Sequence, residues 1–444
     1  MSFSSSQLAK QLTPFLHAPR WLVAYSGGVD SHVLLHSLAQ YPDHPPIEAI
    51  HINHQLQDEA ELWADHCQQQ ADQLNIPLHT MMVTLKTSGN LEEQARLARY
   101  QAFESELKAG DILMMGHHLD DQAETLMLRL LRGSGSRGAA AMPASRPLGQ
   151  GQLARPLLDI PRSAIKQYAE EQSLQWIEDP SNQCSDYDRN FLRLQLLPAM
   201  ATRWPAYRQT LARAASLSEE TADLTDELAV LDFERAGVSP RQASIPVTVL
   251  ENLSRARQKN LVRYWLGSND FTMPSVRQLE VLLDQALNAE QQAQPLISWG
   301  EIQIRRFNGA LFVMNRLPEF DGSQIYNWDL STPLKFGEES RLLTKHHKGQ
   351  GINVARLNDA SVTVRFRQGG ERCQPQGRAH SQSLKKLFQE YELASWLRDR
   401  APLLYCGDDI VAVADLWVCE GWKAGPGDQG VSLIWEPAFD LPRI

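Results

Sequence analysis

The residues with the clearest chemistry follow the first strand-like segment of the chain. Residues 21–25 are largely apolar, as in a buried strand, and residues 32–38 carry apolar side chains at helical spacing. Between them lies the string SGGVDS, residues 26–31. A glycine-rich turn from a strand into a helix leaves backbone N–H groups unpaired at the positive end of the helix dipole. The spacing therefore predicts a site for phosphate oxygens.

Each residue type in this string has a use beside phosphate. The glycines let the backbone approach a ligand without interference from a Cβ atom, and the serines add hydroxyl donors. Asp30 needs another explanation, because a carboxylate fits beside phosphates mainly when a cation lies between them. A bare Gly-Gly turn more often only begins a helix, but the complete string favours phosphate binding. The candidate residues are Ser26, Gly27, Gly28, Val29, Asp30 and Ser31.

A second group of polar residues follows a later strand-like segment and leads into a helix. It contains His117 and His118, and then Asp121 and Glu124, which lie three residues apart and so share a helix face. Such a carboxylate pair can orient a cationic nucleophile such as an amine, or hold Mg²⁺. The structural alternative is a capping box with Asp121 at the N-cap and Glu124 at N3, which needs no function.

Two further groups of candidates are ambiguous from the residues alone. His51 and His54 flank the end of a strand-like segment, where lone histidines are more often structural. The five cysteines are scattered without metal-ligand spacing, so no zinc site is predicted. Arg96 and Arg99 lie on a predicted helix, where they form either a solvated face or a contact for developing phosphate charge.

Alternating strands and helices must position these groups. The predicted strands are 21–25, 47–53, 77–85 and 111–118, and the predicted helices are 58–74, 91–107 and 121–131. Strands that alternate with helices indicate a parallel sheet with helices on both faces. Ligands bind beyond the carboxyl ends of the strands in such sheets, and the polar groups lie at three of those ends. We expect one composite site there.

The remainder of the chain predicts a basic loop and two further domains. Residues 132–151, rich in Gly, Ala, Ser, Pro and Arg, predict a mobile loop over the site, followed by a strand-like piece from 155 and a helix from about 161. Helical segments are predicted at 207–236, 249–266 and 275–287, a hairpin turns at Asn308-Gly309, residues 320–360 look irregular, and a basic helix is expected at 384–398.

These elements define the expected domains. We expect residues 1–203 to form a Rossmann-like α/β catalytic domain with a parallel sheet. Residues 204–318 are expected to form a mostly helical middle domain with a small hairpin. A linker and a small α+β domain are expected in residues 319–444, with a core at about 361–436.

Composition limits the class of protein. The chain has 444 residues, 43% of them hydrophobic and 22% charged, which is ordinary for a soluble globular protein. No run of about 18 apolar residues and no signal-peptide core is present, so a cytoplasmic protein without a membrane span is expected. The net charge of −10 argues against nucleic-acid binding, but residues 129–162 and 361–400 are locally basic. These two patches predict contacts with RNA or phosphate.

Together the strings resemble the tRNA(Ile)-lysidine synthases, a branch of the N-type ATP pyrophosphatase (PP-loop) superfamily. The matching strings are SGGVDS (26–31), HINHQL (51–56), EEQARLARY (92–100), GHHLDDQAETLMLRLLRGSGSRG (116–138), RPLL (155–158), DPSNQCSDYDRNFLR (179–193) and the basic tail string 364–390. Two positions depart from the family pattern. Gln57 stands where many members carry Arg, and Ala394-Ser395 replaces the usual Pro before Trp396.

The resemblance implies a ligase that uses ATP and Mg²⁺. Family members join free L-lysine to the wobble cytidine of an isoleucine tRNA with a CAU anticodon, through an adenylated cytidine, and release AMP and pyrophosphate. The tRNA then reads AUA and is charged with isoleucine. By resemblance, SGGVDS holds the β- and γ-phosphates, Asp30 binds Mg²⁺, and Ile52 and His54 lie near the adenine.

The resemblance also assigns residues to the reaction and to the tRNA. The catalytic candidates are Asp30, His117, Asp121, Glu124 and Arg189, of which His117, Asp121 and Glu124 meet the lysine. The candidates for contact with substrate or tRNA are Arg96, Arg99, Arg129, Arg132, Arg137, Asn190, Arg365, Arg367, Arg372, Lys385 and Lys386. The C-terminal residues among them would hold the tRNA by shape and phosphates rather than by base edges.

Three alternatives compete with this interpretation. A tRNA thiolase of the same superfamily usually carries paired cysteines, and this sequence has no CxxC. A small-molecule ligase or amidotransferase is disfavoured by the two basic patches and the missing glutaminase domain. A non-catalytic tRNA-binding module would not need Asp30 or Glu124. The oligomeric state stays open, with a homodimer as one alternative.

Overall fold

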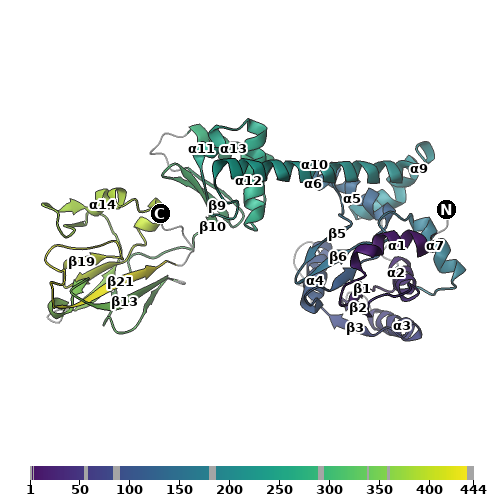
Figure 1. Ribbon diagram of the computed structural model, residues 1–444, viewed down its shortest axis with the longest axis horizontal. Helices are drawn as coiled ribbons and strands as arrows, with labels where there is room; N and C mark the ends of the chain where they lie inside the picture. Colours follow the sequence, from purple (N-terminus) through teal and green to yellow (C-terminus); the bar gives the residue numbers. More distant parts are fainter. Residues whose placement is uncertain are drawn as a thin grey trace. The chain divides into compact units, whose positions relative to one another are not determined.

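The computed structural model describes residues 3, 5–54, 59–83, 91–179, 187–288, 295–337, 340–357 and 361–437. The chain divides into two compact units, residues 1–225 and 226–444 (Figure 1). Residues 55 and 56 of the HINHQL string, Gln57 and residues 180–186 of the DPSNQCSDYDRNFLR string lie outside the described residues. Within the described part of the chain, no helix combines the length and apolar character that a membrane span requires.

A six-stranded sheet forms the centre of unit 1. Its order is β3-β2-β1-β4-β6-β5, with the first five strands parallel and β5 antiparallel to β6. The strands are β1 (Trp21–Ala24), β2 (Ile47–Asn53), β3 (Leu78–Met82), β4 (Ile112–Met114), β5 (Ser145–Leu148) and β6 (Gly151–Ala154). The predicted parallel α/β sheet is confirmed.

Helices cover both faces of this sheet (Figure 1). The helical elements of unit 1 are α1 (Ser5–Leu12), η1 (Thr13–Phe15), α2 (Val29–Ala39), α3 (Ala60–Gln73), α4 (Leu91–Glu106), α5 (Leu119–Leu131), α6 (Ser136–Ala139), α7 (Arg162–Glu171), α8 (Asp188–Phe191), the π-helical turn η3 (Leu192–Leu196), α9 (Leu197–Arg203) and α10 (Tyr207–Ala236). Helix α10 continues from unit 1 into unit 2.

Alternation along β1 divides the core of unit 1 into two. Trp21 and Val23 pack with buried side chains of α1, α2, α3 and α7, whereas Leu22 packs on the other face with Phe103 and Leu107 near the end of α4. Successive strand residues point to opposite faces, so one short strand contributes to both cores. Full burial of such a side chain stabilises the fold by about 1.5–3 kcal/mol. Packing on both faces of the sheet holds the ends of its strands, where the candidate residues lie, in position.

The segment expected to be a mobile basic loop is structured instead. Residues 132–151 contain α6 and β5, and β5 pairs with β6 in an antiparallel hairpin. The predicted strand near 155 lies earlier, at β6. The sequence pattern failed here because β5 is a short edge strand that contains Pro147, which only an edge position tolerates readily. Helix α7 begins at Arg162, as predicted.

Unit 2 begins with helices packed on a small sheet. The helices are α11 (Val247–Glu251), α12 (Arg255–Ser268) and α13 (Val276–Asn288), and the sheet order is β7-β10-β9-β8. Its strands are β7 (Ser244–Pro246), β8 (Leu296–Trp299), β9 (Ile302–Phe307) and β10 (Ala310–Asn315). The hairpin turn at Asn308-Gly309 is confirmed, with positive φ at both residues. The helix predicted over 249–266 is two helices, interrupted at residues 252–254.

The tail of unit 2 contains more strands than expected. One sheet has the order β11-β15-β18-β19-β20, another β12-β13-β21-β14, and β16 pairs with β17. The strands are β11 (Tyr326–Asn327), β12 (Leu334–Phe336), β13 (Ser340–Lys348), β14 (Ile352–Asn353), β15 (Val362–Arg365), β16 (Arg372–Cys373), β17 (Gln382–Ser383), β18 (Leu403–Cys406), β19 (Asp409–Val413), β20 (Trp417–Val418) and β21 (Gln429–Glu436). The helical elements are η4 (Val354–Leu357), α14 (Leu384–Glu390) and α15 (Ser395–Arg398).

Two predictions for the tail are therefore wrong. Residues 320–360 are not irregular, since they supply β11 to β14 and η4. The single basic helix over 384–398 is broken between α14 and α15, where Glu392 takes a φ of 51° that a helix excludes. One core joins the tail to the β9-β10 hairpin, because the rings of Phe307 and Phe312 lie 5.8 and 5.6 Å from that of Trp396.

Candidate functional site

The SGGVDS turn leaves the first backbone amides of α2 available. Gly28 is the N-cap of α2 in an extended conformation and makes no side-chain capping bond, so the amides of the first turn lack partners within the helix. Ser31 Oγ accepts the N–H of Ser26 at 3.2 Å and donates to the carbonyl of Gly28 at 3.0 Å. The Oγ atoms of Ser26 and Ser31 lie 3.1 Å apart. The serines hold the turn in a shape that can receive an anion.

Two glycines allow close backbone contacts around this turn. Gly27 has a φ of +81°, and a Cβ there would lie 2.7 Å from Ile177 Cδ1 and 2.8 Å from Cys67 Sγ. A Cβ on Gly116, which follows β4, would lie 2.9 Å from the carbonyl oxygen of Asp30. The end of β4 is therefore pressed against the first turn of α2. Gly116 is the first residue of the GHHLDD string, but its contact with Asp30 joins residues distant in sequence and was not predicted.

Asp30 has the environment expected of a ligand to a divalent cation. Its Oδ2 lies 3.6 Å from His118 Nε2 and its Oδ1 lies 3.7 Å from Arg162 Nε. Oδ1 is buried and has no hydrogen-bond partner in the described part of the chain. Among the same residues, no group of three or more His, Cys, Asp or Glu could hold a metal ion. A carboxylate oxygen without a hydrogen bond beside a phosphate turn fits Mg²⁺, which shares its coordination with substrate phosphates and water.

The capping box of α5 differs from the predicted one. His118 is the N-cap and Asp121 is N3: His118 Nδ1 accepts the N–H of Asp121 at 3.2 Å, and Asp121 Oδ2 accepts the N–H of His118 at 3.1 Å. The prediction placed Asp121 at the N-cap and Glu124 at N3, and it is wrong because α5 begins at Leu119. Glu124 therefore has no capping role.

Asp121 and Glu124 form a buried cluster with two arginines from α8 and η3. Arg193 reaches both oxygens of Glu124, with Nε 2.7 Å from Oε1 and Nη2 2.9 Å from Oε2. Arg189 bridges the two carboxylates, with Nε 2.8 Å from Glu124 Oε2 and Nη2 2.7 Å from Asp121 Oδ1. Glu124 is only 1% exposed. We call Asp121, Glu124, Arg189 and Arg193 the arginine–carboxylate cluster.

The charges of this cluster extend to the phosphate turn. Burial raises the pKa of Asp121, but His118 and Arg189 lower it more strongly, to about 2. Burial lowers the pKa of Arg193, but Glu124, Asp121 and Asp30 raise it above its ordinary value. Asp121 and Arg193 are therefore both charged at neutral pH. Arg193 was missed by sequence reasoning, although it follows Arg189 by four residues and would share its face on a continuous helix.

His117 lies beside the cluster as a neutral ring. Burial lowers the pKa of His117 to about 3; the charge of Asp121 opposes this shift, and the charges of Arg155 and Arg189 add to it. Arg155 Nε donates to His117 Nδ1 at 3.3 Å. The proton of the neutral ring therefore resides on Nε2, which can donate a hydrogen bond. Arg155 is 5% exposed and was not among the predicted site residues.

Several basic side chains surround Tyr100 at the same edge of the sheet. The guanidinium groups of Arg96 and Arg146 lie 5.8 and 5.2 Å from the centre of its ring. Arg99 Nη2 lies 3.4 Å from His54 Nε2. Burial lowers the pKa of His54 to about 4, helped by the charge of Arg99, so this ring is neutral at neutral pH. This group can attract an anionic ligand.

The remaining candidates of unit 1 lie apart from this group or are tied to the backbone. His51 Nδ1 is 3.0 Å from the carbonyl of Tyr25, and Ile52 packs on the core of the α4 face. Arg129 Nη1 donates to the carbonyls of Gly138 and Ala141 at 3.1 and 2.5 Å. Arg132 pairs with Asp188 in an exposed contact of 3.3 Å. Arg137 lies on α6 and Asn190 on α8.

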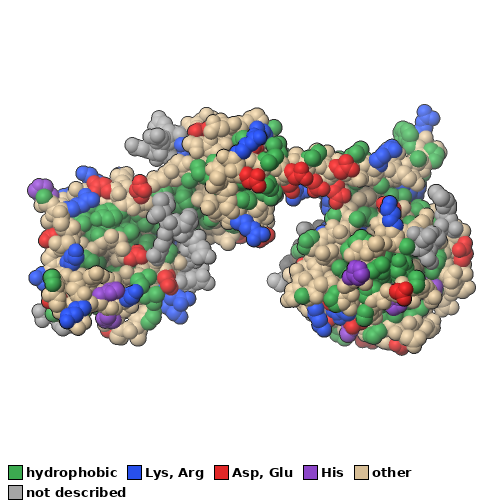
Figure 2. Space-filling model, viewed as in Figure 1, with side chains coloured by type: hydrophobic (Ala, Val, Ile, Leu, Met, Phe, Trp, Pro, Cys, Tyr) green, Lys and Arg blue, Asp and Glu red, His purple; other side chains and the backbone are tan. Residues whose placement is uncertain are grey.

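The candidate residues of the tail are spread over several elements. Arg365 contacts the carbonyl of Gly407 at 2.8 Å and stacks 4.4 Å from the centre of the Tyr405 ring. Arg367 pairs with Asp399 at 2.9 Å, and Arg372 donates to the carbonyl of Ser381 at 2.7 Å. Lys385 and Lys386 are exposed on α14. On the face drawn in Figure 2, Lys and Arg of unit 2 are scattered among other side chains.

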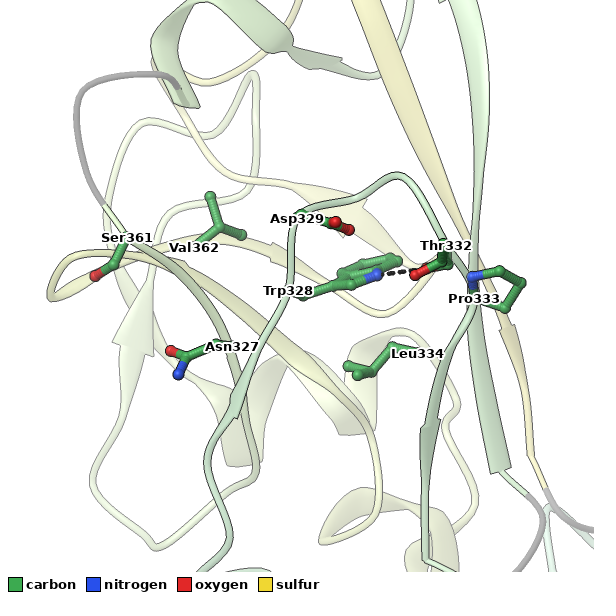
Figure 3. Close-up of a pocket in the computed structure, with 8 residues that line it drawn as sticks. All are labelled: Asn327, Trp328, Asp329, Thr332, Pro333, Leu334, Ser361 and Val362. Carbon is green, nitrogen blue, oxygen red and sulfur yellow. Dashed lines mark hydrogen bonds between the residues drawn. The ribbon is translucent and has the colours of Figure 1, made fainter.

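A pocket in the tail does not coincide with these basic residues (Figure 3). It measures about 470 Å³, and the described residues that line it are Asn327, Trp328, Asp329, Thr332, Pro333, Leu334, Ser361 and Val362. None of these is basic. Trp328 Nε1 donates to the carbonyl of Thr332 at 2.7 Å, which closes one wall. The pocket therefore lacks the charge that an RNA phosphate requires.

Comparison with known proteins identifies the family. Family models match residues 2–200 as a PP-loop domain, 246–312 as a TilS substrate binding domain and 362–435 as a TilS substrate C-terminal domain. The tRNA(Ile)-lysidine synthase of Coxiella burnetii is 39% identical over 98% of this chain and 97% of its own. The enzyme of Pseudomonas putida is 41% identical over 91% of this chain and 94% of its own. The enzyme of Methylococcus capsulatus is 37% identical over 94% of this chain and 96% of its own. The chain belongs to the tRNA(Ile)-lysidine synthase family.

Proposed function

We propose that this protein joins free L-lysine to the wobble cytidine of an isoleucine tRNA with a CAU anticodon, in a ligation that converts ATP to AMP and pyrophosphate. The modified tRNA then reads AUA and is charged with isoleucine. Membership of the tRNA(Ile)-lysidine synthase family supports the reaction. The proposed location of the reaction is supported by one observation: the phosphate turn and the buried carboxylate pair converge at one edge of the parallel sheet.

The first step is transfer of the adenylyl group to the cytosine. The carbonyl oxygen of the base attacks the α-phosphorus of ATP, the bond to the β-phosphate breaks, and pyrophosphate leaves. The first-turn amides of α2 and the hydroxyls of Ser26 and Ser31 would hold the β- and γ-phosphates. Asp30 would hold Mg²⁺, which neutralises charge on the departing pyrophosphate. Ile52 and His54 would lie against the adenine.

The second step replaces the activated oxygen with lysine. An amine of lysine attacks the adenylated carbon, AMP leaves, and the amine loses a proton. Asp121 has a pKa of about 2, because His118 and Arg189 outweigh the effect of burial, so it would bind a cationic substrate by charge and not take its proton. Glu124 would share this role, and Nε2 of His117 would donate a hydrogen bond at the same place.

The basic residues would bind the tRNA. Arg96, which lies over the ring of Tyr100, and Arg99, which lies beside His54, are candidates for phosphate contact, and Arg189 would steady an anionic group near the carboxylate pair. Contacts through phosphates and shape suit the dispersed basic residues of the tail. The further candidates are Arg129, Arg132, Arg137 and Asn190 in unit 1 and Arg365, Arg367, Arg372, Lys385 and Lys386 in the tail. We propose that the reaction takes place in the cytoplasm and that the protein acts as a monomer or a homodimer.

The experiment that tests this function follows pyrophosphate and lysine in one reaction. The purified protein is mixed with ATP, Mg²⁺ and radiolabelled lysine, with or without unmodified isoleucine tRNA carrying a CAU anticodon. We expect pyrophosphate release that depends on the tRNA, with the label entering the RNA. ATP turnover without label in the RNA would contradict the proposed lysine transfer. Methionine tRNA, which shares the anticodon bases, serves as the control and should remain unlabelled.

A further inference from the structure

The arginine–carboxylate cluster is neutral before any substrate enters. Two carboxylates face two guanidinium groups at distances of 2.7–3.4 Å, and both oxygens of Glu124 accept hydrogen bonds. Glu124 is 1% exposed and Asp121 is 8% exposed, so water screens these charges poorly. A substrate ammonium would bring a third positive charge to two carboxylates that are already paired with two guanidinium groups. It can therefore enter at low cost only by replacing one guanidinium group.

The two arginines are not held equally firmly. Arg193 grips both oxygens of Glu124 and lies on η3, between the buried side chains of Leu192 and Leu197. Arg189 lies on α8, the first turn of a helix that continues through η3 and α9, and this turn has no buried residue; its side chain is 34% exposed against 23% for Arg193. Phe191, on the same turn, is 47% exposed. Helix α8 thus has little apolar packing to hold Arg189 in place.

We propose that Arg189 is a resident substitute for the cationic amine of the substrate. The amine takes over the contacts of Arg189 with Asp121 Oδ1 and Glu124 Oε2, while Arg193 remains as the positioning residue that fixes Glu124. An ammonium group has three N–H donors, enough to bridge the same two oxygens. The exchange keeps the cluster neutral and releases a guanidinium beside the phosphate turn. This inference rests on the proposed function, because it concerns how lysine enters that site.

The test compares substitutions at position 189 in the full chain. Labelled lysine is titrated into the reaction with ATP, Mg²⁺ and the CAU-anticodon tRNA, and the half-saturating lysine concentration is measured apart from the maximal rate. In Arg189→Ala the competing cation is gone, so this concentration should fall about tenfold, within the usual range of coupling between two ligands. In Arg189→Lys a competing cation remains, so the value should stay near that of the unsubstituted chain. Arg203→Ala, at the exposed end of α9, is the matched control.

Arg193 supplies the contrasting variant. Arg193→Lys keeps the charge but loses the two-point grip on Glu124, so the half-saturating lysine concentration should rise. If Arg189→Ala raises that concentration or leaves it unchanged, Arg189 does not compete with the amine and the inference is overturned. An equal rise in both variants would have the same consequence, because the two arginines would then act alike.

A binding measurement separates this inference from the proposed function. Free lysine is titrated into each protein in a calorimeter, with neither ATP nor tRNA. Tighter binding by Arg189→Ala than by the unsubstituted chain supports the exchange even if no label enters RNA, in which case the proposed ligation alone fails. Equal binding by the two proteins overturns the exchange even where the unsubstituted chain modifies its tRNA.

Discussion

The arginine–carboxylate cluster of unit 1 and the basic residues of the tail hold their acidic partners in opposite ways. In unit 1, Arg189 and Arg193 converge on two buried carboxylates that belong to one helix. In the tail, Arg367 pairs with Asp399, whose side chain is 73% exposed, and Lys386 lies 3.8 Å from Glu390 one helical turn away. Exposed pairs contribute about 0–1 kcal/mol, whereas loss of one partner from a buried pair costs about 3–5 kcal/mol.

This difference indicates two kinds of recognition. A buried, convergent cluster selects a small ligand by charge count and geometry, because each donor already has a defined acceptor. Dispersed and exposed cations attract a polyanion over a wide surface, and salt weakens that attraction. We therefore expect substitutions in unit 1 to change the chemistry and substitutions in the tail to change tRNA affinity.

The largest effect is expected from Asp30. Asp30→Asn removes the charge beside the phosphate turn but keeps the size of the side chain, so pyrophosphate release should fall about 10²- to 10³-fold. Release is measured with tRNA and ATP at saturation. Asp43→Asn is the control, since Asp43 is exposed and has a φ of 54° that Asn also adopts. Activity within threefold of the control would contradict a cation at Asp30.

Glu124→Gln tests the buried side of the comparison directly. The change leaves the guanidinium groups of Arg189 and Arg193 without one balancing charge, so unfolding free energy should fall by about 3 kcal/mol. Lysine transfer should fall more than pyrophosphate release, because Glu124 is assigned to the amine and not to ATP. Glu390→Gln removes the matching charge in the tail and should cost less than about 1 kcal/mol. If urea unfolding showed equal losses of unfolding free energy in the two variants, the distinction between buried and exposed pairs would be contradicted.

Acid should destabilise unit 1 through its buried histidines. Burial lowers the pKa of His32 to about 4, and this side chain is 2% exposed. The unfolded chain takes up a proton near pH 6.5 and the folded chain only near pH 4, so stability falls as pH drops below 6.5. Between pH 7 and pH 5 the loss is about 2 kcal/mol. His32→Leu should remove this part of the pH dependence in urea unfolding followed by circular dichroism.

Position 380 provides the comparison for that measurement. His380 is exposed in the tail, so His380→Leu should retain the full pH dependence of the unsubstituted chain. The explanation would fail if His32→Leu lost as much stability on acidification as His380→Leu. Both variants are measured at pH 7 and pH 5 in the same buffer series.

The smallest effect is expected in the tail. The double substitution of Lys385→Ala and Lys386→Ala should weaken tRNA binding several-fold at low salt and reduce the slope of log affinity against log salt by about 1–2. The half-saturating concentration of lysine should not change. Filter binding over a range of salt concentrations gives the slope. An unaltered slope would show that these two lysines do not meet phosphates.

The sequence predicted the sheet because its signals are local. Apolar strands, the glycine turn and helical spacing each lie within about ten residues, and they placed the phosphate turn, His117 and the carboxylate pair at one edge. Arg155 and Arg193 lie within the matched strings, but their roles depend on contacts between segments far apart in the chain, so the sequence did not assign them to the site. The strand β13 was missed for the same reason, since it pairs with β21 near the end of the chain.

The contact of Trp396 with the β9-β10 hairpin has a consequence for synthesis of the chain. Phe312 of the hairpin leaves the ribosome 84 residues before its aromatic partner Trp396. At about 5–20 residues per second, the rings of Phe307 and Phe312 remain without their contact to Trp396 for roughly 4–17 s. A nascent chain stalled in that interval presents two aromatic side chains to water. Premature termination there should yield an aggregation-prone fragment.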